Sequence, residues 1–124
     1  MSQIVVDTDV ASYLFNWHSL AQDYANALRG SELVLSFMSV AEPRMGAMSA
    51  VWGPHRRLLL EQFMRGFELF YADNDLCTVW VRTRTDARAA GRPMSPQDAW
   101  IAAPALALDA PLATNNQAGL RTRP

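Results

Sequence analysis

Three acidic residues and one amide follow apolar runs of the chain in a way that could build a metal site. Asp7 comes directly after the run IVV at residues 4–6, and Glu42 lies five residues past a second run, ELVLSF. Asp98 lies in the first turn of a predicted helix that a proline opens, and Asn116 follows the last apolar run. Oxygen ligands of this kind suit Mg²⁺ or Mn²⁺ rather than zinc.

The elements that must position these residues alternate between strand and helix. Strands are predicted at residues 4–6, 32–37, 67–71 and 112–114, and helices at 9–15, 20–28, 39–51, 55–65, 75–90 and 96–108. This alternation predicts a parallel sheet that helices cover on both faces. Ligands bind outside the carboxyl ends of such strands, so one pocket is expected to hold Asp7, Glu42, Asp98 and Asn116. Carboxylates at such short separations repel one another unless a cation neutralises their charge.

Each of these residues also has a simpler structural explanation. The stretches Ser95-Pro-Gln-Asp98 and Ser39-Val-Ala-Glu42 both have the form of a capping box, in which the serine caps a helix and the acid lies in its first turn. Asp7 could cap the helix that follows it, and a pair of asparagines commonly forms a turn. The set is harder to explain in this way, because independent caps need not all fall at one edge of the sheet.

Length and composition indicate one globular domain over residues 1–124, half of whose residues are hydrophobic. The net charge of −1 predicts neither general nucleic-acid affinity nor a role at a membrane surface. The single cysteine, Cys77, excludes an intrachain disulfide. Polar residues interrupt every apolar run well before about 18 residues, and no secretory leader is visible. These features lead us to expect a cytoplasmic protein without a membrane span.

Three stretches resemble a known family. They are VVDTDVASYLF near the start, SVAEPR in the middle and SPQDAWIAAPALALDAPLATNN near the end. Together they resemble a PIN domain and, more narrowly, the VapC-type toxins of bacterial toxin–antitoxin pairs. The resemblance implies a three-layer α/β/α sandwich with a central parallel sheet of four to five strands. It also implies an Mg²⁺- or Mn²⁺-dependent endoribonuclease that forms homodimers and is neutralised by a cognate antitoxin of the VapB type.

By motif, the family's three acids fall on Asp7, Glu42 and Asp98, and its fourth position falls on Asn116. The resemblance implies that the three carboxylates bind the metal, while the amide is a neutral ligand or orients the water. Such a metal would lower the pKa of a bound water and offset charge on the phosphate in the transition state. The sequence leaves open whether one ion or two are bound.

Several neighbouring residues have supporting roles in this interpretation. Thr8 and Asp9 stand where the family usually has Thr-Asn, and Thr114 matches the threonine that commonly precedes the fourth position. Arginine side chains could hold the RNA backbone, because a guanidinium binds phosphate bidentately. The candidates approach the loop before Asp98, although a solvated helix face is the simpler explanation for any one of them: Arg82, Arg84, Arg88 and Arg92.

The chain departs from the family pattern at Pro43, Pro104 and Gly119. Pro104 falls inside a predicted helix, where it removes one backbone hydrogen bond and should kink the helix at a cost of about 3 kcal/mol if nothing compensates. These departures leave a second possibility open: a catalytically impaired module that acts through dimerisation and antitoxin binding. An apolar stripe on the helices at 20–28 and 55–63 is a candidate groove for such a partner.

Two further alternatives come from other classes of protein. The stretch DTDVA resembles the DxD motif of haloacid-dehalogenase-like phosphatases, in which one aspartate is a nucleophile. That chemistry needs a lysine beside the phosphate, whereas all eleven basic residues of this chain are arginine. The lack of lysine also excludes a P-loop and Schiff-base chemistry. A plain α/β domain that binds a small molecule in the same crevice is the other alternative, and the acids argue against an anionic ligand there unless metal is present.

Overall fold

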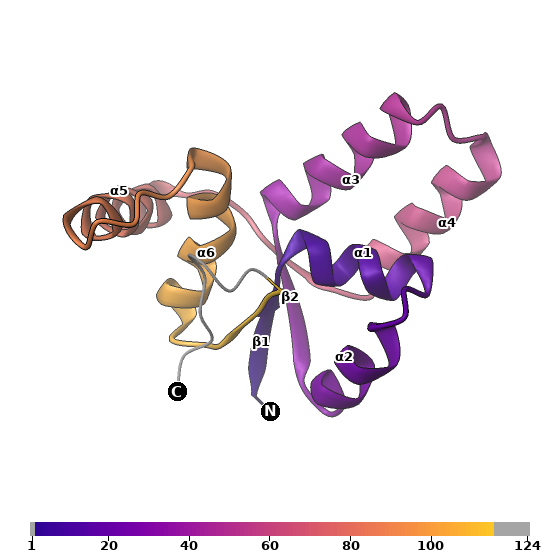
Figure 1. Ribbon diagram of the computed structural model, residues 1–124, viewed down its shortest axis with the longest axis horizontal. Helices are drawn as coiled ribbons and strands as arrows, with labels where there is room; N and C mark the ends of the chain where they lie inside the picture. The colour runs from indigo at the N-terminus through magenta and orange to yellow at the C-terminus, as the bar shows by residue number, and fades with distance from the viewer. Residues whose placement is uncertain (1, 116–124) are drawn as a thin grey trace.

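The computed structural model describes residues 2–115, which form a parallel sheet with helices on both faces (Figure 1). Asn116 and Gly119 lie outside the described residues. The strands, in the order β3-β2-β1-β4 across the sheet, are β3 (Glu68–Phe70), β2 (Glu32–Ser36), β1 (Gln3–Val6) and β4 (Leu112–Ala113). The helices are α1 (Thr8–Asn16), α2 (Ala21–Leu28), α3 (Phe37–Ser49), α4 (Pro54–Met64), α5 (Asn74–Ala89) and α6 (Pro96–Leu108). The predicted alternation of strand and helix is therefore confirmed.

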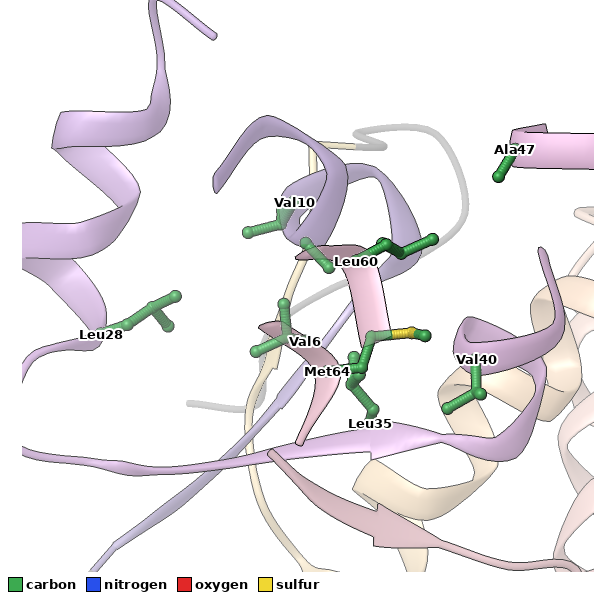
Figure 2. Packing of buried hydrophobic residues seen from close by; sticks show 9 residues of the cluster. Val6, Val10, Leu28, Leu35, Val40, Ala47, Leu60 and Met64 are labelled. Carbon is green, nitrogen blue, oxygen red and sulfur yellow. The ribbon is translucent and has the colours of Figure 1, made fainter. Parts of the chain in front are cut away.

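Alternating side chains of the central strands build one core on each face of the sheet. Val6 and Leu35 pack with residues of α1 to α4, including Leu60 and Met64, as Figure 2 shows. Their neighbours in the strands face the other side and pack against α6, where Ile101 is buried. Because both faces are covered, the two central strands contain continuous apolar runs, at residues 4–6 in β1 and 33–35 in β2, as expected for a parallel sheet. The result is the three-layer α/β/α sandwich (Figure 1).

The pairing of the strands brings their carboxyl ends to one edge. Val5 pairs with Val34 on one side and with Leu112 on the other, all in parallel. The residues that leave the sheet at this edge are therefore Asp7 after β1, the first turn of α3 after β2, and Thr114 after β4. Within residues 2–115, no helix is long and apolar enough to cross a membrane.

Helix α3 begins two residues earlier than the sequence predicts. The Ser36 hydroxyl caps it by accepting a hydrogen bond of 3.2 Å from the Met38 backbone N–H. The interpretation of Ser39 as a helix cap is therefore wrong, because Ser39 lies inside the helix and is buried. Pro43 also lies inside α3, which continues through it to Ser49.

Pro104 lies inside α6, and a side chain from another element compensates for its missing N–H. In a regular helix, the amide of residue 104 would donate to the carbonyl of Trp100, four residues earlier. The Ser36 hydroxyl donates to that carbonyl instead, with an oxygen–oxygen distance of 2.7 Å. The backbone group that proline leaves without its helical partner is therefore satisfied, and the same bond ties the end of β2 to α6.

Candidate active site

Asp7 is a buried acid at the carboxyl edge of the sheet, with 6% of its surface exposed. Its backbone N–H donates to the Ala113 carbonyl at 2.9 Å, which continues the pairing of β1 with β4. The Thr114 hydroxyl donates to Asp7 Oδ2 at 2.6 Å. Asp7 occupies the N-cap position of α1, but its side chain makes no capping hydrogen bond. The Thr114 hydroxyl therefore holds the carboxylate toward the end of β4.

The surroundings of Asp7 make its negative charge unfavourable. Burial is the largest influence and raises the pKa of the Asp7 carboxyl. Hydrogen bonding from the Thr114 hydroxyl and a weaker interaction with the Asp9 backbone lower this pKa in part, while the charges of Asp9 and Asp98 raise it further. Asp9 and Asp98 are therefore within electrostatic reach of Asp7. A cation bound at this edge would act in the opposite direction and favour the ionised carboxylate.

Thr8 connects the start of α1 to Glu42 on α3. Its hydroxyl donates to Glu42 Oε1 at 2.6 Å and lies 2.8 Å from the Ser39 hydroxyl. A hydroxyl carries a single proton, so Thr8 accepts from Ser39 while it donates to Glu42. Sequence reasoning missed this role of Ser39. The signal was its spacing of three residues from Glu42, which puts both side chains on one face of the helix.

Asp98 lies in the first turn of α6, as predicted. The Ser95 hydroxyl accepts a hydrogen bond of 3.1 Å from the Asp98 backbone N–H, so Ser95 is the N-cap and Pro96 the first helical residue. The bond between Ser36 and the Trp100 carbonyl fixes this turn beside the end of β2. Helix capping accounts for the hydrogen bond of the Asp98 backbone N–H. The negative charge of its carboxylate contributes to the raised pKa of Asp7.

The carboxylates do not form a finished metal site within the part of the chain that the structure describes. Among residues 2–115, no three Asp, Glu, His or Cys side chains are grouped closely enough to hold a metal ion. Asp7 and Glu42 each accept a hydrogen bond from a threonine. The oxygen-only donor set fits Mg²⁺ or Mn²⁺ in its chemistry. The assignment of Asn116 lies outside the described residues and stays a prediction.

Arg84 has a structural role. Its Nε donates to the Met94 carbonyl at 3.1 Å, and its guanidinium lies 5.3 Å from the ring centre of Trp80. Trp80 in turn stacks on Trp100 with ring centres 4.9 Å apart. Arg84 therefore braces the loop that leads to Asp98. The other three arginine candidates for RNA contact are exposed: Arg82, Arg88 and Arg92.

A second feature is a groove of about 1260 Å³ between α1, α2 and α4, which we call the α2–α4 groove. Trp17, at the end of α1, lines it and is 81% exposed. The other lining side chains are mostly apolar and include Leu14, Ala21, Leu28, Leu59 and Phe63. An exposed apolar surface of this kind commonly marks a partner site. It lies on the two helices where the sequence indicated an apolar stripe.

Comparison with known proteins adds to this geometry. Ribonuclease VapC1 of Haemophilus influenzae strain R2866 is 27% identical over 114 residues, which cover 90% of this chain and 85% of that protein. Two solved structures match the fold. The VapBC2 complex of Rickettsia felis, bound to a promoter DNA fragment, has a TM-score of 0.79 at 22% identity and covers 92% of this chain and 88% of its own. VapBC-1 of nontypeable H. influenzae has a TM-score of 0.68 at 25% identity, with coverage of 92% and 87%.

The family model described as PIN domain matches residues 4–122, which span β1 to β4 and all the candidate site residues. The resemblance seen in the sequence motifs therefore extends over almost the entire chain. The chain belongs to the PIN domain family.

Proposed function

We propose that this PIN domain is a divalent-metal-dependent endoribonuclease toxin that a cognate antitoxin neutralises. The observation that carries the proposal is Asp7, which Thr114 holds at the carboxyl edge. Its burial, and to a lesser extent the charges of Asp9 and Asp98, make its ionised form unfavourable. A cation is the partner that such an arrangement of acids favours. The similarity to proteins named ribonucleases, which covers 90% of this chain, supports cleavage of RNA.

Asp7, Glu42 and Asp98 are the residues that would hold the cation. Each carboxylate offers about four lone-pair sites, so the hydrogen bonds from Thr114 and Thr8 leave capacity for a metal. A bound Mg²⁺ or Mn²⁺ would supply positive charge beside the scissile phosphate and acidify the attacking water. The two threonines fix the orientation of the carboxylates.

The exposed arginines near α5 are suited to contact the RNA backbone. A guanidinium presents two parallel donors that match the oxygens of a phosphate. Arg82 and Arg88 lie on α5, and Arg92 follows it in the loop that leads to α6. Since the net charge of the chain is −1, these local charges, and not the protein as a whole, would attract RNA.

The α2–α4 groove is the surface where we expect the antitoxin to bind. The similar solved structures include a toxin–antitoxin complex from Klebsiella pneumoniae, which has a TM-score of 0.78. The groove is lined mainly by apolar side chains, and Arg29 and Arg56 also line it. An antitoxin helix with an apolar face and acidic flanks would complement this surface. Homodimerisation belongs to the same proposal.

Cleavage by the purified protein tests the function. We expect it to cut total cellular RNA with Mg²⁺ or Mn²⁺ and to stop with a chelator, and we expect Asp7→Asn to be inactive. Asp86→Asn removes the same charge from an exposed position on α5 and should cleave normally. If the wild-type protein cuts no RNA with either ion, and calorimetry detects no metal binding, the chain is a binding module and the nuclease proposal is wrong.

A further inference from the structure

Two tyrosines and one asparagine form a cluster beside Asp7, and none of the roles above uses it. Tyr13 lies in α1, Tyr24 lies in α2, and Asn115 follows β4. The Tyr24 hydroxyl donates to Asn115 Oδ1 at 3.0 Å, and Asn115 Nδ2 donates to the Tyr13 oxygen at 3.3 Å. The two rings stack with their centres 6.1 Å apart. A single amide therefore bridges two helices, and both of its polar atoms are engaged.

This cluster adjoins the candidate active site. Asn115 directly follows Thr114, whose hydroxyl donates to Asp7. Burial raises the pKa of Tyr24. The interaction with Tyr13, which ionises only in the same alkaline range, and the negative charges of Asp7 and Asp9 add to the effect. The influence of both aspartates means that the Tyr24 hydroxyl lies within electrostatic reach of the site. The tyrosines therefore hydrogen-bond to the residue after Thr114, and Tyr24 lies within electrostatic reach of Asp7, the acid to which Thr114 donates.

The segment that carries Thr114 lies at the end of a short strand. Strand β4 has only two residues, and its pairing with β1 ends at Val6 and Ala113. The Asp7 N–H bond to the Ala113 carbonyl, at 2.9 Å, fixes the peptide that leads into Thr114. The hydrogen bonds of the next side chain, Asn115, supply a second anchor, to α1 and α2. Tyr13 is itself held by the ring of His18, whose centre lies 4.3 Å away.

We propose that Tyr13 and Tyr24 are positioning residues that clamp the Asn115 amide and so keep the Thr114 hydroxyl on Asp7 Oδ2. The geometric part concerns the protein without metal or substrate. The catalytic part rests on the proposed nuclease function, because it requires Asp7 to be oriented for metal binding. The two parts can therefore be tested separately.

The first test measures the Thr114 side chain in the metal-free protein. Tyr24→Phe keeps the ring and removes only the hydroxyl that donates to Asn115. Three-bond NMR couplings should report one χ1 rotamer of Thr114 in the wild-type protein and averaged rotamers in Tyr24→Phe. Asn115→Ala opens the clamp at an exposed residue and should give the same averaging. Tyr71→Phe removes a phenol hydroxyl from a side chain that is 67% exposed and should leave the couplings unchanged.

Unchanged Thr114 couplings in Tyr24→Phe and Asn115→Ala would overturn the proposal, whether or not the protein cuts RNA. The second test is steady-state cleavage. We expect Tyr24→Phe to lower kcat about three- to tenfold, the factor that one neutral hydrogen bond is worth, with KM unchanged. The double variant Tyr24→Phe/Asn115→Ala should have a kcat no lower than that of the less active single variant, because both substitutions open the same clamp. A normal kcat alongside averaged rotamers would refute the catalytic part.

Discussion

Replacing Ser36 with alanine tests how the fold accommodates a proline in α6. Ser36 is fully buried, and its hydroxyl makes two hydrogen bonds at once. It donates to the Trp100 carbonyl at 2.7 Å and accepts from the Met38 N–H at 3.2 Å. Loss of the helix cap costs about 0.5–2 kcal/mol. A carbonyl left without its donor costs a further ~1–3 kcal/mol. We therefore expect Ser36→Ala to lower the free energy of unfolding by roughly 2–4 kcal/mol.

The second variant, Pro104→Ala, separates these two contributions. It returns a backbone N–H four residues after Trp100, so the carbonyl can form its helical bond without Ser36. In that background, Ser36→Ala should cost only the loss of the cap. The two substitutions should therefore couple by roughly 1–2 kcal/mol, which a double-mutant cycle measures. Urea unfolding of the metal-free protein, followed by circular dichroism and by tryptophan fluorescence, gives the four free energies.

Ser95→Ala is the matched control for this cycle. Ser95 caps α6 through the Asp98 N–H at 3.1 Å but is exposed. Its loss should cost about 1 kcal/mol, a cap alone. It should cost the same with and without Pro104→Ala. If Ser36→Ala costs equally much in both backgrounds, the hydroxyl does not substitute for the missing amide, and the compensation argument fails.

Three further outcomes are expected. The native state of the metal-free protein retains the Asp7 proton more readily than the unfolded chain does, because burial raises the pKa above 3.8, so stability should fall as pH rises from about 3.8 through the raised pKa. Urea titrations should show that Asp7→Asn abolishes this fall and is more stable at neutral pH. Asp98→Asn and Glu42→Gln should each reduce RNA cleavage to background while circular dichroism shows a native fold. Trp17→Ala should weaken antitoxin binding about 10- to 100-fold by calorimetry, with cleavage unchanged.

The elements could be predicted from local patterns, whereas their ends depended on contacts between distant residues. Apolar runs identified the four strands found within residues 2–115, because both faces of a parallel sheet are covered. The predicted start of α3 was wrong by two residues, because both Ser36 and Ser39 are suitable N-cap residues for this helix. The pattern Ser39-Val-Ala-Glu42 suits a capping box, but Ser36 caps the helix and Ser39 bonds to Thr8. Nothing near Ser39 in the sequence reveals that partner, which is 31 residues away.

In the candidate site, too, local patterns predicted part of the arrangement and contacts between distant residues determined the rest. The positions of Asp7 and Asp98 followed from strand and helix ends, and the structure brings them within electrostatic reach. The directions of the side chains could not be predicted, since each depends on a partner on another element. The hydrogen bond from Thr114 to Asp7 spans 107 residues. The role of Arg84 could not be predicted either. It depends on the contact of Arg84, on α5, with the Met94 carbonyl in the following loop, which the sequence does not reveal.

The side chains that hold the carboxylates of Asp7 and Glu42 are uncharged, and this bears on what the site can bind. Thr114 donates to Asp7, and Thr8 donates to Glu42. Within residues 2–115 the ion pair is between Arg44 and Glu61, which link α3 to α4. A lysine or arginine paired with Asp7 would neutralise its charge permanently and compete with a metal ion. Neutral hydroxyls orient the carboxylates and leave their charge uncompensated. The lack of lysine in the chain is thus consistent with a site whose charge a divalent cation balances.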